Sequence, residues 1–353
     1  MLKIQIILCF VLLLFIKSER RVCRNQNGDE VDWFLIFLLP VKTTEYKLSY
    51  YYIDDTMDKL QLFEHSDYTF PPNTLTKYAL SKETDFNFFF WNDDNTTKNM
   101  DMDKLYSNSS SYYAHSKGGL VYDNDTGAFL LTSLPRYPTR DSENNLYIEM
   151  PNNTGIYAQD FLCISIEKKT SEKIVELLNY IAVSNNKCVE KDRVNNVPNE
   201  FVKRLINLDY DYDSYPLFTE TDISSLNGKK FHVISKHRKR NITPFNEDVT
   251  LIYKDSFYVR SWSKPALSDP VCDQYKVLNV LNITIGNSSI TKGQEHSKWA
   301  VAEKKNISCI SDLNHVDSQA IRGGNIFCFT DAKITNIMRN FIVVHDECIE
   351  ISN

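Results

Sequence analysis

Two short stretches of the sequence place a lysine two positions after a histidine. The stretch "AHSKGGLVYD" contains His115 and Lys117, and "EHSKWAVAE" contains His296 and Lys298. Cleavage of a phosphodiester needs a nucleophile, a proton for the leaving oxygen and positive charge for the phosphoryl oxygens. Histidine can act as nucleophile or as acid, and lysine supplies a fixed charge. The two stretches together could therefore fill every role in this reaction without a metal or a cofactor.

The spacing of each pair suits one shared target. On a β-strand, residues i and i+2 point to the same face, so each histidine and its lysine could aim at one phosphate. Chance alone gives about one His-x-Lys in a chain of this composition. A third copy, His237 with Lys239, lies in the basic run "KHRKR", which we expect to be a solvated turn or a contact to a polyanion. The other two copies run into apolar residues, as strands that enter a core do.

Both helices and strands are expected to position the two histidines and the two lysines. Helical spacing of apolar residues predicts one helix around 174–181, with Thr170 or Ser171 as its cap, and another around 334–341. Strands mixed with helices favour an α/β or mixed α+β fold, and the polar region 185–216 is the predicted boundary between two halves. Apolar and aromatic runs predict strands at 31–40, 85–91, 127–135, 161–166, 230–235, 250–263 and 275–285.

The first twenty residues have the pattern of a secretory signal. Lys3 precedes an unbroken apolar run at 4–16, and polar residues follow it at once. The run is short for a membrane span, although a buried or anchoring helix is the alternative. No later segment is long and apolar enough to span a bilayer. We therefore predict a chain that is secreted or lysosomal.

Charge and sequons refine this picture. The formal net charge of −6 argues against a protein that binds nucleic acid by bulk charge, so a polyanion would need a local basic patch.

Seven cysteines follow the signal segment, so in an oxidising compartment most should pair and at least one is left over. The acceptor asparagines of N-x-S/T triplets, which indicate export, are Asn95, Asn108, Asn124, Asn152, Asn241, Asn282, Asn287 and Asn306.

The chain resembles the deoxyribonuclease II family, whose fold is related to phospholipase D and whose hallmark is two separated HxK motifs. The resemblance spans essentially the whole mature chain. The segments that carry it, in the family's order, are "VDWF", "WNDD", "AHSKGGLVYD", "AQDFLCIS", "EHSKWAVA" and "CISDLNHVDSQAIRGGNIFCF".

The resemblance implies a phospholipase D-like fold of two pseudo-symmetric halves that form one active site. The expected bounds are 1–20 for the signal peptide, 21–190 for the first half and 191–353 for the second. One histidine would attack phosphorus and form a phosphohistidine. The other would protonate the leaving 5′ oxygen, so that cleaved DNA carries 3′-phosphate ends. We assign attack to His115 and the acid role to His296, an order that the sequence alone leaves open.

The resemblance also implies supporting residues. Asp123 and Glu303 follow the two HxK pairs and could orient the histidines, although exposed carboxylates at strand ends are the alternative. Asn92, Asp312 and Asn314 lie in the matching segments. The implied disulfides are Cys23 with Cys163, Cys272 with Cys348 and Cys309 with Cys328, which leaves Cys188 over.

One departure from the family pattern bears on activity. Thr132 stands where relatives carry a histidine, and a threonine cannot exchange a proton near pH 6. Both HxK pairs are nevertheless intact, so the predicted function is an acid-active, metal-independent endonuclease whose partner is DNA. The alternative is an inactive secreted relative that binds partners without cleaving them. A phospholipase is a weaker third option, because the longer HxKxxxxD spacing is incomplete.

Overall fold

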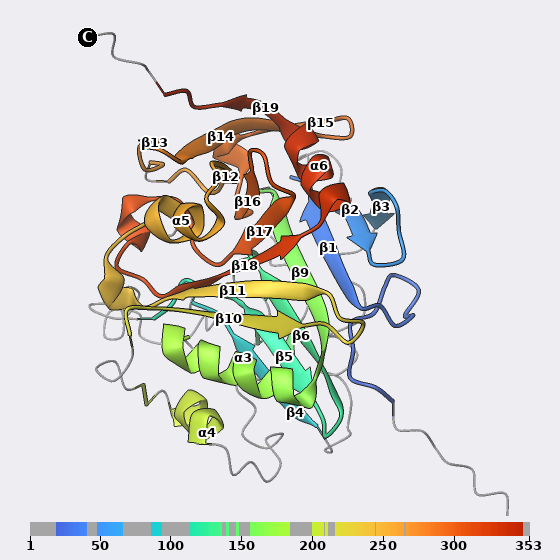
Figure 1. Cartoon of the computed structure of the whole chain (residues 1–353). Coiled ribbons are helices and arrows are strands. Elements are labelled where there is room, and N and C mark those ends of the chain that lie inside the picture. The colour runs from blue at the N-terminus through green and yellow to red at the C-terminus, as the bar shows by residue number, and fades with distance from the viewer. Residues whose placement is uncertain are drawn as a thin grey trace, which may run out of the picture.

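Two β-sheets and a few helices make up a mixed α/β fold (Figure 1). The computed structural model describes residues 19–40, 48–65, 86–93, 113–135, 139–140, 146–147, 156–183, 200–207, 209–210, 216–243, 245–264 and 266–348.

The first sheet is built from residues of the N-terminal half. It has seven strands in the order β3-β2-β1-β9-β6-β5-β4, and every pairing between neighbours is antiparallel. Its strands are β1 (Trp33–Leu38), β2 (Leu48–Asp54), β3 (Gln61–His65), β4 (Asn87–Trp91), β5 (Gly118–Tyr122), β6 (Thr126–Thr132) and β9 (Gln159–Glu167). A separate short ribbon pairs β7 (Thr139–Arg140) with β8 (Leu146–Tyr147).

The second sheet is built from residues of the C-terminal half. It has ten strands, whose main order is β10-β11-β18-β17-β16-β12-β14-β13, and β15 and β19 also pair with β14. The strands are β10 (Phe218–Ser224), β11 (Lys230–Lys236), β12 (Phe257–Arg260), β13 (Val271–Cys272), β14 (Lys276–Ile285), β15 (Ser288–Thr291), β16 (Trp299–Ala302), β17 (Ile307–Ser311), β18 (Gly324–Thr330) and β19 (Ile342–His345).

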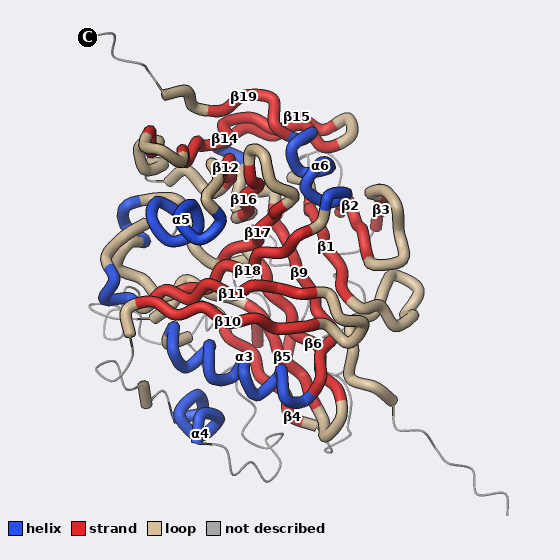
Figure 2. The backbone as a smooth tube through the Cα atoms, viewed as in Figure 1, coloured by secondary structure: helices blue, strands red, loops and turns tan. Residues whose placement is uncertain are grey.

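The helices lie around the two sheets, as Figure 2 shows in blue. No helix in the described part of the chain has both the length and the hydrophobicity needed to cross a bilayer. The α-helices are α3 (Lys168–Ile181), α4 (Glu200–Asn207), α5 (Thr250–Tyr253) and α6 (Ala332–Phe341), and the shorter helical turns are η2 (Arg238–Arg240), η3 (Phe245–Val249), η4 (Lys292–Gln294) and η5 (Asp317–Gln319).

The structure corrects two details of the predicted elements. Helix α3 begins at Lys168, so Thr170 and Ser171 lie inside it, and the Ser171 hydroxyl donates back to the carbonyl of Glu167 rather than capping the helix. The strand expected over 250–263 is a helical turn followed by the short strand β12. Its first residues continue the π-helical turn η3, which takes them out of the sheet.

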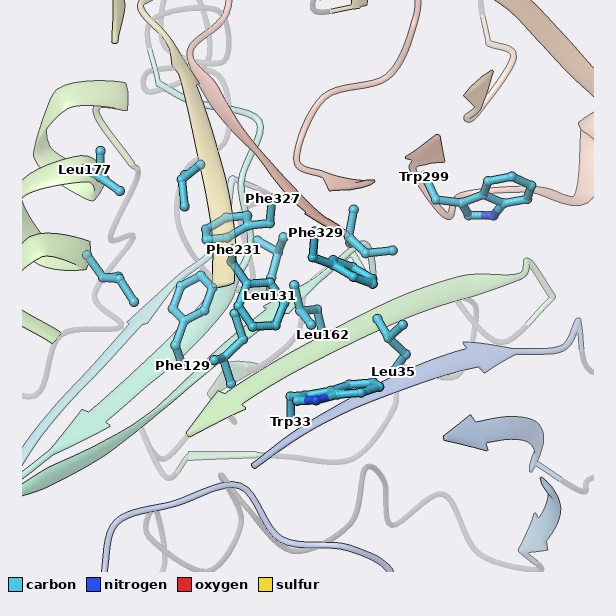
Figure 3. Packing of buried hydrophobic residues seen from close by; sticks show 14 of the residues in the cluster. Trp33, Leu35, Phe129, Leu131, Leu162, Leu177, Phe231, Trp299, Phe327 and Phe329 are labelled. Atoms are coloured by element: carbon cyan, nitrogen blue, oxygen red, sulfur yellow. The ribbon is translucent and has the colours of Figure 1, made fainter. Parts of the chain in front are cut away.

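One hydrophobic core joins the two sheets. Phe129 of β6 and Phe327 of β18 lie with ring centroids 5.1 Å apart, and Trp33 and Trp299 belong to the same buried cluster (Figure 3). Burial of large apolar side chains is the main favourable term in folding. The sheets therefore stabilise each other, while the predicted boundary between halves near residue 190 lies outside the described residues and stays a prediction.

Three disulfides link distant parts of the chain. They join Cys23 to Cys163 on β9, Cys272 on β13 to Cys348, and Cys309 to Cys328 across β17 and β18. These are the pairs that the resemblance implied. The first bridge joins residues 140 apart in sequence, which in the chain-entropy model strongly restricts the unfolded chain. Cys188 and all but the last two residues of the predicted signal segment lie outside the described residues.

We predict that Phe129→Ala destabilises both sheets in one cooperative transition. The variant loses a buried ring that contacts the second sheet, so the free energy of unfolding should fall by about 3–5 kcal/mol. Denaturant unfolding followed by fluorescence and by circular dichroism measures it. Leu251→Ala, at a side chain that is 61% exposed, is the control and should change stability by less than about 0.5 kcal/mol. Two separated transitions in Phe129→Ala would contradict a shared core.

Candidate active site

Each His-x-Lys segment is held by the opposite half of the molecule. The amide of His115 donates to the carbonyl of Gly323 (3.1 Å), and the amide of His296 donates to the carbonyl of Ala158 (2.9 Å). Both segments lie immediately before strands, β5 and β16, and not within them as the sequence suggested. The amides of His115 and His296 donate to the other half of the molecule and not to a neighbouring strand of their own sheet. Strands β5 and β16 therefore begin after these histidines.

His115 is fixed by a carbonyl oxygen. Its Nδ1 lies 2.9 Å from the main-chain oxygen of Asp312, which can only accept, so Nδ1 carries the proton. The other ring nitrogen, Nε2, lies 3.6 Å from the carboxylate of Asp93, and the side chain is 12% exposed. Burial, followed by the nearby Lys117 ammonium, holds the pKa of His115 well below its usual value. The neutral form of the ring is therefore favoured, and Nε2 is its basic nitrogen.

Lys117 is part of a buried ionic cluster. Its ammonium pairs with Asp93, whose carboxylate also lies 3.0 Å from the guanidinium of Arg322. Burial would raise the pKa of Asp93, but Lys117, His115 and Arg322 together hold it well below the usual range. Arg322 in turn donates to the carbonyls of Tyr113 (3.1 Å) and Ala114 (3.0 Å). This cluster ties the approach to His115 to the second half.

Two aromatic rings enclose His296. Tyr157 stacks on it with centroids 4.2 Å apart, and Trp262 lies on it at 4.4 Å. Among the residues that the structure describes, none hydrogen-bonds to Nε2 of His296. Burial, then Lys298 and Lys117, lower the pKa of His296 to about 3. The rings therefore fix the plane of a neutral imidazole whose Nε2 is left for another partner.

Lys298 is buried beside a carboxyl group of the first half. Its amide donates to Asp160 (2.7 Å), and its ammonium donates to the carbonyl of His296 (3.0 Å). Burial, followed by Lys117, lowers the pKa of Lys298 to about 8. Burial raises the pKa of Asp160 to about 7, against the pull of Lys298. The lysine is mostly charged at acid pH, where it offers a positive group to an anion.

The two pairs share one electrostatic environment. The ammonium of Lys298 contributes to the low pKa of His115, and that of Lys117 contributes to the low pKa of His296, in each case after burial and the pair's own lysine. A backbone path also links the pairs, because His115 bonds to the carbonyl of Asp312 and the amide of the preceding Ser311 donates to the carbonyl of Lys298 (2.8 Å). The two His-x-Lys segments therefore lie close together in the fold.

A buried ion pair lies beneath the second segment. Arg260 and Glu295 are both fully buried and bond at 2.7 Å. Glu295 also accepts from the amide (2.9 Å) and the hydroxyl (2.5 Å) of Ser297. The guanidinium donates further to three main-chain carbonyls, so all parts of the pair are hydrogen-bonded. This pair fixes the backbone between the second histidine and its lysine.

Three predicted supporting residues lie near the site. Asp312 holds His115 through its carbonyl, and its carboxyl, which accepts from the Asn325 amide, has a pKa raised to about 7 by burial. Asn314 is buried and accepts from the amide of Trp262 (3.2 Å), the ring that covers the second histidine. Asn92 is buried directly before Asp93.

The other two supporting residues lie away from the site. Asp123 follows the far end of β5, where it accepts from the amides of a tight turn and lies 3.7 Å from Arg21. Glu303 is exposed at the far end of β16. A strand advances about 3.3 Å per residue, so neither carboxylate can reach back to its histidine. Glu303 fits the alternative of an exposed carboxylate at a strand end, whereas Asp123 lies at a strand end but is only 14% exposed.

Thr132 has a structural role next to the first pair. Its amide donates to the carbonyl of Lys117 (3.1 Å), and its hydroxyl donates to the carbonyl of Asp160 (3.1 Å). The side chain is buried, and its oxygen also accepts from the amide of Leu134. The hydroxyl therefore fastens two segments of the site together.

The basic run 236–240 is solvated only in part, with Lys239 exposed and Arg238 and Arg240 half-buried. Lys236 is buried, and its ammonium donates to the carbonyls of Ala320 (2.6 Å) and Arg322 (2.7 Å). His237 is also buried, and Arg240 pairs with Asp248. The bonds of Lys236 hold the turn that carries Arg322, so this residue supports the candidate site through the backbone.

Most described sequons are at the surface. Asn124, Asn241, Asn287 and Asn306 are exposed, while Asn282 is half-buried in β14. The remaining predicted acceptors, Asn95, Asn108 and Asn152, lie outside the described residues.

Sequence reasoning did not single out several residues of the cluster. The sequence offered one indication that three of these residues belong to the site, namely their place inside segments that resemble the family: Asp93, Asp160 and Arg322. Tyr157 adjoins such a segment, since it directly precedes "AQDF". Each was found only through its contact with a residue far away in the chain.

Comparisons with known proteins agree on one family. A family model described as Deoxyribonuclease II matches residues 22–348. Cell-death-related nuclease 7 of Caenorhabditis elegans is 23% identical over 98% of this chain and 93% of its own length. Deoxyribonuclease-2-beta of Mus musculus is 27% identical over 87% of this chain and 86% of its own. Plancitoxin-1 of Acanthaster planci is 24% identical over 94% of this chain and 93% of its own.

We predict that Asp312→Asn makes stability less dependent on pH. Folding raises the pKa of the Asp312 carboxyl from about 3.8 to about 7. The resulting contribution to stability is complete below the pKa of the unfolded chain and is lost as the pH rises through the pKa of the folded protein. Between pH 5 and pH 8 the free energy of unfolding of the variant should therefore improve by about 2 kcal/mol relative to the unsubstituted protein. Denaturant titrations at several pH values measure this difference. A difference that does not change with pH would contradict the raised pKa.

Proposed function

The chain belongs to the deoxyribonuclease II family, and we propose on that basis that it hydrolyses DNA at acid pH without a metal. His115 attacks phosphorus through Nε2 and forms a phosphohistidine. His296 gives a proton to the departing 5′ oxygen, and water then releases a 3′-phosphate end. Lys117 and Lys298 bind the phosphoryl oxygens and balance their charge.

The observation that carries this proposal is the approach of the two His-x-Lys pairs to one another. His115 bonds to the carbonyl of Asp312, and the adjacent Ser311 amide donates to the carbonyl of Lys298 (2.8 Å). Each lysine also contributes to lowering the pKa of the histidine in the opposite pair, with burial as the main cause. A bound phosphodiester would reverse this effect, because its negative charge favours the protonated form of a nearby imidazole. Acid then supplies the proton that His296 must carry, while the bond from Nδ1 to the Asp312 carbonyl keeps Nε2 of His115 basic.

The arrangement of strands supports the proposal of two related halves. The order β1-β9-β6-β5-β4 in one sheet matches β11-β18-β17-β16-β12 in the other. Each His-x-Lys pair directly precedes the matching strand, β5 or β16, and each of the strands β9 and β18 is followed by a helix. This repetition fits the phospholipase D-like architecture with halves at 21–190 and 191–353. Three disulfides fit a secreted or lysosomal location.

We predict that His115→Ala and His296→Ala each abolish the nicking of plasmid DNA at pH 5 in excess EDTA. Each change removes a group that takes part in the chemical step, so the loss should be at least about a thousandfold. Gel analysis of nicking measures it, and end-labelling of the products identifies the 3′-phosphate. His232→Ala is the matched control and should keep full activity, because that ring pairs with Glu220 away from the site.

Other outcomes of the same experiment separate the alternatives. Salt-sensitive DNA binding without cleavage at any acid pH would select the inactive binding protein, with Thr132 as the altered position. Cleavage that EDTA abolishes would contradict the metal-independent mechanism.

A further inference from the structure

Asp93 occupies a position with the chemistry of a phosphate site. Its carboxylate pairs with Lys117, lies 3.0 Å from Arg322 and lies 3.6 Å from Nε2 of His115. The side chain is only 4% exposed, so these charges meet with little water between them. Lysine and arginine around one anion are the groups that proteins use to bind phosphoryl oxygens. The resting site therefore already holds an anion.

The orientation of His115 shows where that anion lies relative to the reaction. Nδ1 donates to the Asp312 carbonyl, so the lone pair of the neutral ring is on Nε2. Nε2 faces the carboxylate of Asp93, and two acceptors in that arrangement do not attract each other. A phosphorus atom under attack by Nε2 would need the space on this side of the ring. The carboxylate thus stands in the place of the reacting group.

We propose that Asp93 is a placeholder for the substrate phosphate, and that Arg322 is a third cation that the phosphate takes over when it displaces the carboxylate. This proposal rests on the proposed function for the nature of the substrate, a phosphodiester. It adds two residues to the site and gives them distinct roles.

The contacts of Asp93 separate this role from that of an orienting carboxylate. A carboxylate that orients a histidine accepts a hydrogen bond from its ring N–H. Here the Asp312 carbonyl already does so, and 3.6 Å from Nε2 to Asp93 is longer than a hydrogen bond. Arg322, in contrast, is anchored by its bonds to the carbonyls of Tyr113 and Ala114. It stays in place when its counter-ion moves.

The carboxylate of Asp93 stays charged in acid. It pairs with Lys117 and lies 3.0 Å from Arg322, and in spite of burial these cations hold its pKa well below the usual range. Lower pH therefore does not remove the carboxylate from the two cations, and an incoming phosphate must displace it by its own binding energy.

The test compares the binding of inorganic phosphate to the unsubstituted protein and to Asp93→Asn at pH 5. Removal of the competing charge should tighten phosphate binding by about tenfold, as measured by calorimetry. Phosphate should also raise the melting temperature of the variant more than that of the unsubstituted protein. Asp123→Asn, an ion-paired carboxylate at the far end of β5, is the control and should leave phosphate binding unchanged. Unchanged or weaker binding by Asp93→Asn would overturn the proposal.

Two further variants test the charge itself. Asp93→Glu keeps the carboxylate and should bind phosphate as weakly as the unsubstituted protein. Arg322→Lys in the Asp93→Asn background loses the forked geometry and should lose most of the gain in affinity. Full retention of that gain would exclude Arg322 from the phosphate site.

The same measurements keep the two proposals distinguishable. If phosphate binding follows this pattern but the unsubstituted protein cuts no DNA, the proposed function fails and the anion site stands. If the unsubstituted protein cuts DNA but Asp93→Asn binds phosphate no more tightly, the placeholder role fails and the proposed function stands.

Discussion

The exchange of hydrogen bonds between the two halves is the constraint on which the site depends. Each histidine that could do chemistry takes its backbone partner from the other half, His115 from Gly323 and His296 from Ala158. Backbone groups fix position more strictly than long side chains, because the peptide has few soft dihedrals. The shared core keeps these partners at bonding distance. Each His-x-Lys segment is therefore held by a residue from the other part of the chain, and this geometry exists only while the two sheets remain packed.

Concentrated positive charge has a cost that the surrounding carboxyl groups offset. Lys117 and Lys298 are both buried, and two ammonium groups in poorly solvated surroundings repel each other. The carboxylate of Asp93 pairs with Lys117 and reduces that repulsion even in acid, whereas Asp160 and Asp312, whose pKa values are raised to about 7, contribute negative charge only toward neutral pH. The same burial and the same charges hold both imidazoles neutral. An anion that binds between them would receive a preorganised set of partners at little cost in reorganisation.

The sequence predicted what depends on local pattern and on repetition. The apolar runs became strands except at 250–263, where a helical turn precedes the short strand β12, and two amphipathic periods became α3 and α6. The recurrence of His-x-Lys pointed to two segments that the fold brings together. It did not predict partners that come from distant segments, such as Asp93 beside Arg322. Nearness along the chain was also misleading. Asp123 is six residues from Lys117, but a strand separates them and carries the carboxylate to its other end.

The buried pair of Arg260 and Glu295 has a consequence for how this protein can change over generations. Loss of either member alone would strand an uncompensated charge in the interior, which is far more damaging than replacing both. A substitution of Arg260 is therefore expected to be tolerated only together with a substitution of Glu295. A descendant that abandoned chemistry altogether would still be obliged to keep them matched for as long as it folded. Their joint presence is accordingly a marker of common architecture and carries no information about whether a lineage still catalyses a reaction.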